Sequence, residues 1–364
     1  MPSKKILHIT PNGLGNAGVP SVILSIVSNL HNQYQFGCTV YKRKLGRENE
    51  FTALGGKLHR INILDHSSCI KRVVDVTFRG VILLYNIYKI CKKEKYDVIH
   101  CHMGWESAFC LLGAKIAGVK SLIVHAHNPK TKQHNLVKTV IFSALLKIAN
   151  FLSTKKIGCS EQTCITNFRK DYQVVNNAID LTEFTYNETH SKEHIKLIHV
   201  GRFDYQKNQE FVLDILAELI KIRSDINLSL VGFGMNERML RKKVEQLQLE
   251  QYVSFVDGTK ADVAQLFCDS DYMIFPSRFE GFGIVLLEAQ ASGVYCFVSD
   301  AVQDVTNVGL WEKISLDDSA ETWARKILYR IEHGYDVTKE DVLQRLQQFD
   351  IKEIAKQYAE IYNE

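Results

Sequence analysis

Short apolar runs alternate with helical patterns along this chain, and the alternation occurs in two series. Strands that are separated by helices form parallel sheets, because each helix returns the chain to the same edge. We therefore expect an α/β protein in which each half has a parallel sheet with helices on both faces. The expected strands lie at residues 5–9, 37–41, 98–102 and 122–127 in the first series and at residues 195–202, 227–232, 253–256 and 272–275 in the second.

The length of the chain also favours two domains, because 364 residues exceed what one typical core organises. Residues 186–193 are polar and lack hydrophobic periodicity, so we interpret them as the linker. We expect an N-terminal domain over residues 1–187 and a C-terminal domain over residues 188–340. An amphipathic helix over residues 341–364 is expected to pack back on the N-terminal domain.

The clearest ligand signal is a strand-to-helix turn within residues 275–289. Gly281 and Gly283 allow a close approach of the backbone, and unpaired N–H groups at a helix start favour phosphate. Glu280 lies in the loop and Glu288 at about the second turn of the helix, so the two carboxylates can face different parts of one elongated ligand. The turn therefore predicts a phosphate-containing ligand with hydroxyl groups at both ends.

Two cations follow an earlier strand of the same half. Arg202 comes after the strand end, and Lys207 lies in the polar loop beyond it. Opposite the Gly281–Gly283 turn, the arginine fork and the lysine point charge would neutralise a diphosphate. If these residues are taken alone, solvated surface cations remain the alternative.

A glycine loop follows the first expected strand. Gly13, Gly15 and Gly18 match the spacing G-x-G-x-x-G of dinucleotide-binding loops. The acidic residue expected about 20 positions later is not evident. A tight turn without a ligand therefore stays open as an interpretation.

Four histidines form two His-x-His pairs at expected strand ends, where ligands of parallel sheets gather. The pairs are His100 with His102 and His125 with His127. Alternate residues of a strand share a face, but no carboxylate or cysteine partner stands at a recognisable spacing, and no metal is expected. For His127 we favour a neutral ring that offers a hydrogen bond to a substrate, whereas structural roles remain open for the other three.

Charge divides the chain into a basic and an acidic part. Residues 1–185 contain 25 Lys and Arg against 11 Asp and Glu, a net +14, and the remainder contains 20 against 30, a net −10. Residues 71–95 and 130–156 interleave basic with apolar side chains. This favours contact of the first part with an anionic membrane surface, whereas no nucleic-acid motif occurs. Ordinary surface helices with a buried stripe are the alternative.

The nine cysteines predict a reducing compartment. Their number is odd and no Cys-x-x-Cys pair occurs, which argues against a disulfide framework or a structural zinc site. No apolar run reaches the roughly 18 residues of a membrane span, and no small-residue cleavage site follows the basic start. We expect a cytoplasmic protein, peripheral at the inner face of the cell membrane.

Several motifs together carry a family likeness that covers nearly the whole chain. They are Gly13-Leu14-Gly15, residues 96–102, residues 123–128, residues 176–180, Gly201-Arg202-Phe203 with Lys207-Asn208, and Glu280 with Glu288 followed by residues 289–293. The chain resembles the retaining glycosyltransferases of family 4, whose GT-B architecture has two facing Rossmann-like domains with a cleft between them. It looks most like the bacterial members that assemble capsular or extracellular polysaccharide from nucleotide sugars.

The resemblance implies a role for each charged residue of the second domain. Arg202 and Lys207 would hold the diphosphate of the nucleotide-sugar donor and stabilise it as it leaves. Glu280 and the adjacent glycine-turn amides would meet the donor sugar, and Glu288 would accept hydrogen bonds from the ribose hydroxyls. The donor-binding set is then Arg202, Lys207, Gly281, Phe282, Gly283 and Glu288.

In the first domain the resemblance places His127 beside the donor sugar and the amides of Gly13 and Gly15 near phosphate or acceptor. The implied catalytic set is Glu280, His127, Arg202 and Lys207. Transfer would retain the anomeric configuration, with the departing diphosphate helping to deprotonate the acceptor on the same face. Neither a metal nor another cofactor is implied, because two cations and a helix terminus neutralise the leaving group.

The implied activity is that of a hexosyltransferase-type enzyme (EC 2.4) with a lipid-linked or polysaccharide acceptor, and UDP is expected on family frequency. A nucleotide-sugar epimerase of the same architecture and a catalytically silent partner subunit are the alternatives. The sequence departs from the family pattern at Gly293-Val294, where proline often follows the glycine, and at Asn16-Ala17 in the glycine loop. These departures put the two loop conformations in doubt.

Overall fold

The computed structural model describes residues 3–11, 13–15, 18–41, 46–61, 72–129, 136–188 and 194–364, with only the backbone described for residues 72–77 and 136–137. The chain forms two compact units, which are described separately. Unit 1 comprises Met1–Ala178 and Ile351–Glu364, and unit 2 comprises Ile179–Asp350.

The change of unit after residue 178 comes earlier than the boundary expected after residue 187. Residues 179–188 pack with unit 2, since the Ile179 N–H donates to the Phe349 carbonyl and the Asn187 N–H donates to the Ser292 carbonyl. The expected linker lies partly outside the described residues.

Unit 1 is built on a seven-stranded, fully parallel sheet with the order β3-β2-β1-β4-β5-β6-β7. Its strands are β1 (Lys5–Ile9), β2 (Gln35–Tyr41), β3 (Lys57–Ile61), β4 (Val98–Cys101), β5 (Ser121–Ala126), β6 (Lys155–Gly158) and β7 (Gln173–Val174). Its helices are α1 (Gly18–Leu30), α2 (Glu48–Ala53), α3 (Arg72–Glu94), α4 (Ser107–Ala117), α5 (Leu136–Leu152), α6 (Glu161–Asn167) and α13 (Ile351–Asn363).

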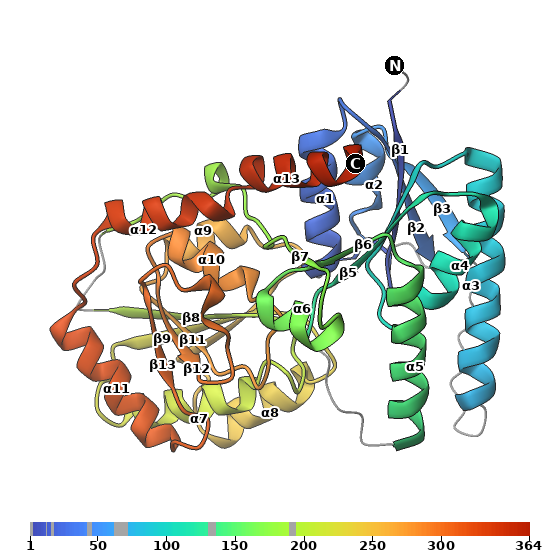
Figure 1. The fold of residues 1–364 in the computed structure, drawn as a ribbon. Coiled ribbons are helices and arrows are strands. Elements are labelled where there is room, and N and C mark those ends of the chain that lie inside the picture. The colour runs from blue at the N-terminus through green and yellow to red at the C-terminus, as the bar shows by residue number, and fades with distance from the viewer. Residues whose placement is uncertain are drawn as a thin grey trace. The chain divides into compact units, whose positions relative to one another are not determined.

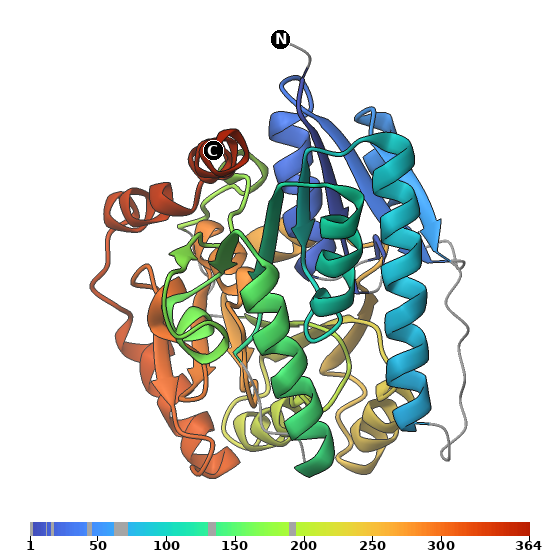
Figure 2. The same ribbon diagram turned by 45° about the vertical axis from the view of Figure 1, so that its right-hand side comes forward.

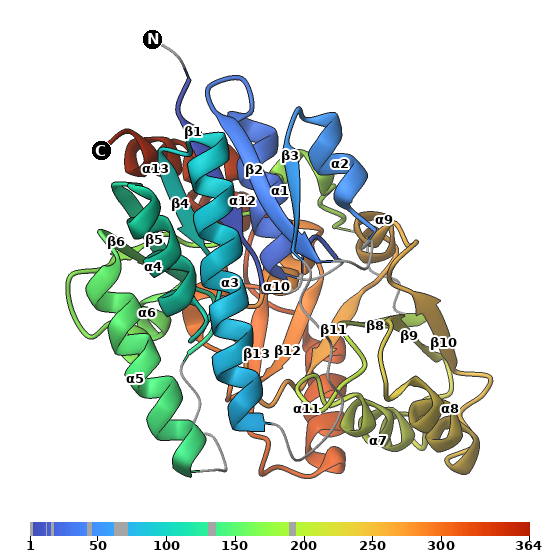
Figure 3. The ribbon, with the colours of Figure 1, turned by 90° about the vertical axis from the view of Figure 1, so that its right-hand side faces the viewer.

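Helices cover both faces of this sheet, as the strand–helix alternation predicts. On one face α4 packs between α3 and α5 (Figures 2 and 3). On the other face α1 and α13 lie side by side (Figure 1). The central strands β1 and β4 are almost wholly buried, which explains why they read as short continuous apolar runs.

Unit 2 has a six-stranded parallel sheet with the order β10-β9-β8-β11-β12-β13. The strands are β8 (Ile195–Val200), β9 (Ile226–Gly232), β10 (Val253–Asp257), β11 (Tyr272–Phe275), β12 (Tyr295–Ser299) and β13 (Trp311–Ile314). The helices are α7 (Gln209–Ile220), α8 (Glu237–Gln246), α9 (Val263–Cys268), α10 (Ile284–Ala291), α11 (Ala320–His333) and α12 (Lys339–Leu346), with 3-10 turns η2 (Leu181–Glu183), η3 (Asp304–Thr306) and η4 (Gln347–Phe349). Helices α7, α8 and α11 lie on one face and α9, α10 and α12 on the other (Figure 1).

The single terminal helix expected over residues 341–364 is two helices in the structure. Thr338 caps α12 by accepting a hydrogen bond from the Asp341 N–H, and α12 ends in η4 within unit 2. The chain then returns to unit 1, where α13 buries its apolar face. Asp350, which is extended between the two helices, explains the break in the helical pattern.

Two further features concern the surroundings of the protein. Among the described helices, none combines the length and the hydropathy that a membrane crossing requires. The described cysteines are free thiols, and all of them except Cys268 are buried.

Candidate functional site

The candidate site of unit 2 lies where the strand order reverses. Strands β8 and β11 are neighbours, but β8 continues to β9 on one side and β11 continues to β12 on the other. In open parallel sheets ligands bind at the carboxyl ends of strands at such a switch point. The loop after β8 carries Arg202 and Lys207, and the loop after β11 carries Glu280, so the topology brings the three predicted residues to one edge.

Lys207 and Glu280 form an ion pair at this edge. The Nζ–Oε1 distance is 2.7 Å, and both side chains are largely buried, with 15% and 7% of their surfaces exposed. The ammonium also lies 4.6 Å from the centroid of the Phe275 ring, in a cation–π contact. The family resemblance implies that Lys207 binds the diphosphate and Glu280 the sugar, and the structure places the two groups in direct contact.

Arg202 is more exposed than Lys207. About half of its side chain is accessible, and its guanidinium pairs with Asp204 at 2.9 Å. Its backbone carbonyl is fixed by a hydrogen bond from the Gln209 side chain. Arg202 can therefore exchange a local carboxylate for a ligand without disturbing the core.

The two loops of the site are fastened together by polar side chains to which the sequence analysis assigned no role. Asn208 adopts a left-handed conformation (φ 57°) before α7, and its side-chain amide donates to the Pro276 carbonyl at 3.1 Å. Arg278 donates from its guanidinium to the Asn208 side-chain oxygen and from its backbone N–H to the Gln206 carbonyl. These bonds position Lys207 and Glu280, and only the fold reveals them.

The glycine turn begins α10. Gly283 has φ +83°, a conformation that favours glycine, and the Gln303 side-chain amide donates to the carbonyls of Glu280 and Gly281. Phe282 is 3% exposed and packs edge-on against Phe349, so its backbone, not its ring, is available to a ligand.

Two hydroxyl groups near this turn are buried and have no hydrogen-bond partner among the described residues. They belong to Ser277 and Thr306. The Thr306 hydroxyl would be 3.9 Å from a Cβ built on Gly283. Buried hydroxyls without partners are uncommon in folded proteins.

Glu288 lies on α10 and is partly buried. Burial and, to a smaller extent, the negative charge of Glu183 raise the pKa of its carboxyl to about 7, although the Lys207 ammonium opposes both effects. Glu288 is therefore partly protonated near neutral pH. A carboxyl group of this kind can accept hydrogen bonds from hydroxyls when it is ionised.

In unit 1 the four predicted histidines lie together, and a fifth joins them. His8 on β1 stands in register with His100 on β4, and His125 on β5 follows next in the sheet order. His102 and His127 come directly after β4 and β5. His100 and His125 lie within their strands and not at the strand ends, and all but His127 are buried.

The ring nitrogens of these histidines contact one another. His8 Nδ1 lies 2.9 Å from His102 Nε2, and His102 Nδ1 lies 2.8 Å from His127 Nε2. His100 Nε2 lies 3.1 Å from His125 Nδ1. Two groups of three that share His102 have ring nitrogens within 4.8 Å, so they are the described residues that could hold a metal.

The glycine loop after β1 is described in part. Gly13 has φ +72°, and its N–H donates to the Thr10 hydroxyl at 2.7 Å. Gly15 is partly buried in the same loop. Asn16 and Ala17, where the sequence departs from the family pattern, lie outside the described residues.

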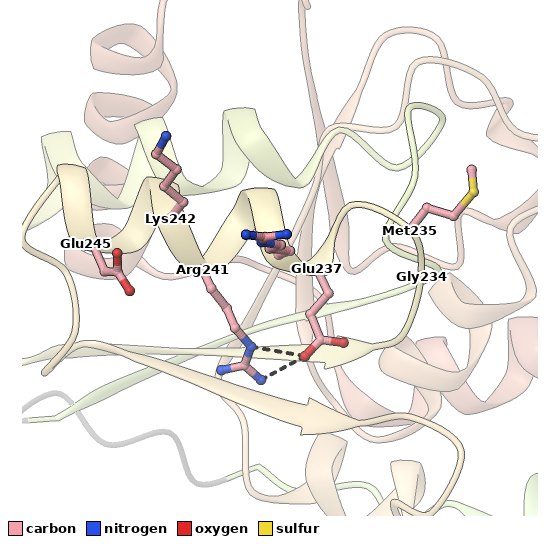
Figure 4. A pocket seen from close by; sticks show the side chains of 7 residues that line it. Gly234, Met235, Glu237, Arg241, Lys242 and Glu245 are labelled. Carbon is pink, nitrogen blue, oxygen red and sulfur yellow. Dashed lines mark hydrogen bonds and ion pairs between the residues drawn. The ribbon is translucent and has the colours of Figure 1, made fainter.

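A hollow over α8 in unit 2 is a separate feature (Figure 4). Charges of both signs line it, and Glu237 pairs with Arg241 at 2.9 Å. The lining residues are Gly234, Met235, Glu237, Arg238, Arg241, Lys242 and Glu245. None of them was predicted as a site residue, and we assign the hollow no role.

Known proteins that are similar to this chain are glycosyltransferases. Residues 182–331 match the family model "Glycosyl transferases group 1". The putative glycosyltransferase EpsF of Bacillus subtilis is 26% identical over 89% of this chain and 87% of that protein. The capsular polysaccharide biosynthesis glycosyltransferase CapH of Staphylococcus aureus is 24% identical over 98% of both.

Solved structures show the same fold. Anabaena HepE, solved with UDP and glucose, superimposes with a TM-score of 0.79 at 17% identity over 98% of both chains. WaaG, a glycosyltransferase involved in lipopolysaccharide biosynthesis, gives a TM-score of 0.72 at 14% identity over 98% of this chain and 99% of that chain. The α/β architecture with two parallel sheets is thus confirmed. The chain has the GT-B fold, and residues 182–331 match a glycosyl transferases group 1 domain, which together with the relatives supports a glycosyltransferase role.

Proposed function

We propose that this chain is a retaining, metal-independent enzyme that transfers a sugar from a UDP-sugar to a lipid-linked or glycan acceptor in bacterial surface polysaccharide biosynthesis. The observation that carries the proposal is the buried Lys207–Glu280 ion pair at the β8–β11 switch point, beside the glycine turn of α10. The UDP in the HepE structures supports the nucleotide. A galactosyltransferase of Escherichia coli that is named for a UDP-Gal donor and a diphosphoundecaprenol acceptor, 28% identical over 60% of this chain, supports the acceptor class.

In this proposal Lys207 and Arg202 stabilise the leaving diphosphate. An ammonium group has three N–H donors, so Lys207 can keep its bond to Glu280 and donate to a phosphate oxygen as well. Arg202 turns from Asp204 to the phosphates, where its planar fork can bind two oxygens. The N–H groups at the start of α10 add partial positive charge, and no step requires a metal.

The remaining groups bind hydroxyls. Glu280, held by Lys207, accepts hydrogen bonds from the donor sugar, and Glu288 accepts them from the ribose. His127 offers a neutral ring to the substrate, since burial lowers its pKa to about 4. Retention follows when the acceptor attacks from the face that the diphosphate leaves, with a phosphate oxygen taking the acceptor proton.

The proposal is tested with purified protein, a panel of nucleotide sugars and excess EDTA. The proposal is supported if UDP is released slowly and NMR shows that the product has the anomeric configuration of the donor. Isomerised nucleotide sugar would indicate an epimerase instead, and the absence of binding to any nucleotide sugar would indicate a silent partner. Lys207→Met should abolish nucleotide release, whereas the exposed Lys260→Met in the same unit is the matched control.

We also propose that unit 1 contacts an anionic membrane surface through α3, α4 and α5. These helices expose large apolar side chains that the fold leaves uncovered, namely Phe78, Val81, Tyr85, Leu112, Ile116, Val140, Ile148 and Phe151. Basic residues interleave with them, and Lys89 lies over the Tyr85 ring at 4.6 Å. Apolar side chains with flanking cations bind the interface of anionic bilayers.

A further inference from the structure

The histidine cluster of unit 1 contains a continuous hydrogen-bonded chain of three rings. It runs from His8 through His102 to His127 over distances of 2.9 and 2.8 Å. His8 and His102 are buried, whereas His127 is partly exposed. The His8 end of this row of hydrogen-bonded rings therefore lies in the core, and the His127 end can contact a ligand.

Hydrogen bonding explains this cluster better than metal ligation. A metal must lie along the lone pair of each ligating ring, so the ring planes have to converge on it. The His8 and His102 rings are instead stacked at an interplanar angle of 23°, and the His102 and His127 rings are stacked at 24°. Stacked rings point their nitrogens in nearly parallel directions, which suits contacts between neighbours in a hydrogen-bonded row.

Each ring of the chain carries one proton at neutral pH. Burial lowers the pKa of His8 to about 3 and that of His127 to about 4, and burial together with the neighbouring rings holds the pKa of His102 well below its usual range. A neutral imidazole has one N–H donor and one acceptor nitrogen. With two bonds among three neutral rings, the protons have only two possible arrangements.

The two arrangements differ at the buried end of the chain. If the bonds run outward, His8 donates from Nδ1 to His102, His102 donates from Nδ1 to His127, and His8 Nε2 keeps a lone pair. If they run inward, His8 Nε2 carries an N–H. Among the described residues this atom is buried and has no partner. Buried N–H groups without an acceptor are rarer than buried acceptors without a donor, so the outward arrangement is favoured.

We propose that His8 and His102 are positioning residues that hold His127 in the Nδ1–H tautomer, so that His127 presents a hydrogen-bond donor to its ligand. The ligand group is then an oxygen lone pair, such as that of a sugar hydroxyl. The identification of the ligand as a sugar hydroxyl rests on the proposed function, whereas the assignment of the His127 tautomer does not. The nitrogen that carries the proton is set by the bond that the other nitrogen makes.

The tautomer of each ring can be measured directly in the unliganded wild-type protein. With ¹⁵N-labelled histidine, long-range ¹H–¹⁵N NMR distinguishes protonated from unprotonated ring nitrogens, and single substitutions of His8, His102 and His127 assign the signals. We expect all three rings to be protonated at Nδ1 between pH 6.5 and 8. Protonation of His127 or His102 at Nε2 would overturn the proposal, whatever the enzyme transfers.

Two variants of His102 separate positioning from packing. The amide of His102→Asn lies near the position of Nδ1 and can still donate to His127 Nε2, whereas His102→Gln reaches toward His8 and leaves His127 without a donor. The Nδ1–H signal of His127 should persist in H102N and be lost or averaged in H102Q. The value of kcat/KM in H102Q should be about two- to tenfold below that of H102N, as for one lost hydrogen bond.

Equal tautomers and equal kcat/KM in the two variants would contradict a positioning role. Thermal unfolding identifies any variant that fails to fold, in which case the wild-type spectrum still decides. An enzyme that shows the Nδ1–H tautomer but no nucleotide-sugar chemistry would refute the proposed function and leave this inference standing.

Discussion

The carboxyl of Glu288 should make the free protein less stable as the pH rises. Its pKa in the folded chain is about 7, against an ordinary value of 4.5, because folding buries it near Glu183. Between these two values the unfolded chain releases the proton first, so ionisation favours unfolding. The contribution of this carboxyl to the stability of the folded state should therefore fall from about pH 4.5 to pH 7 and stay lower above pH 7. Glu288→Gln removes this dependence.

The size of the effect follows from the displacement of the pKa. A shift from 4.5 to about 7 corresponds to about 3 kcal/mol. Solvent reaches part of the side chain and screens the charge, so we expect about 1–2 kcal/mol. In a unit of this size that is a rise in Tm of about 2–8 °C for the glutamine variant above pH 7, and no rise at pH 4.

Thermal unfolding of Glu288→Gln and wild type at pH 4, 6 and 8 measures this difference. Glu245→Gln, at an exposed position on α8, is the matched control and should show no pH-dependent shift. The same glutamine variant should bind a UDP-sugar more weakly, with KM raised more than kcat is lowered. A Glu288→Gln protein that is less stable than wild type at pH 8, or equally shifted at every pH, would refute the reasoning.

Three further outcomes are expected. Lys207→Met should lower the free energy of unfolding by about 3–5 kcal/mol, because Glu280 is left buried without its partner. The double variant Lys207→Met/Glu280→Leu should recover stability in urea unfolding but should not recover turnover in the activity assay. Arg202→Ala should change the free energy of unfolding by less than about 0.5 kcal/mol, because the side chain is half exposed. The same variant should lower kcat/KM by about 10- to 150-fold, and unchanged kinetics would exclude a role of Arg202 in binding the diphosphate. Binding to vesicles should require anionic lipid, weaken with salt and weaken in Phe151→Asp, and salt-insensitive binding would contradict the membrane proposal.

Most strands that are buried on both faces could be predicted, although β12, which is buried at every residue, and β13 were not among the expected strands. Strands β4 and β11 are buried at every residue and read as apolar runs in the sequence. Strands β3 (Lys57–Ile61) and β6 (Lys155–Gly158) were missed, because each contains two basic residues and is only partly buried. Their strand state is set by pairing with neighbours and not by local hydropathy.

The site could be predicted in its members but not in its contacts. Arg202, Lys207 and Glu280 follow strands that the topology places side by side. The Lys207–Glu280 pair joins positions 73 residues apart, so no local pattern announces it. His8 was missed for the same reason, since its hydrogen bond to His102 spans 94 residues. The roles of these residues toward a ligand stay predictions.

The return of the chain to unit 1 in α13 has a consequence during translation. The ribosome synthesises all of unit 2 before it adds Ile351–Asn363, whose residues Ile354, Tyr358 and Tyr362 are buried. Until then, the Tyr362 hydroxyl that contacts His100 Nδ1 at 2.7 Å is missing from the sheet of unit 1. Unit 2, which is continuous in sequence, is therefore made whole at a stage when the part of unit 1 that packs against α13 still lacks that helix.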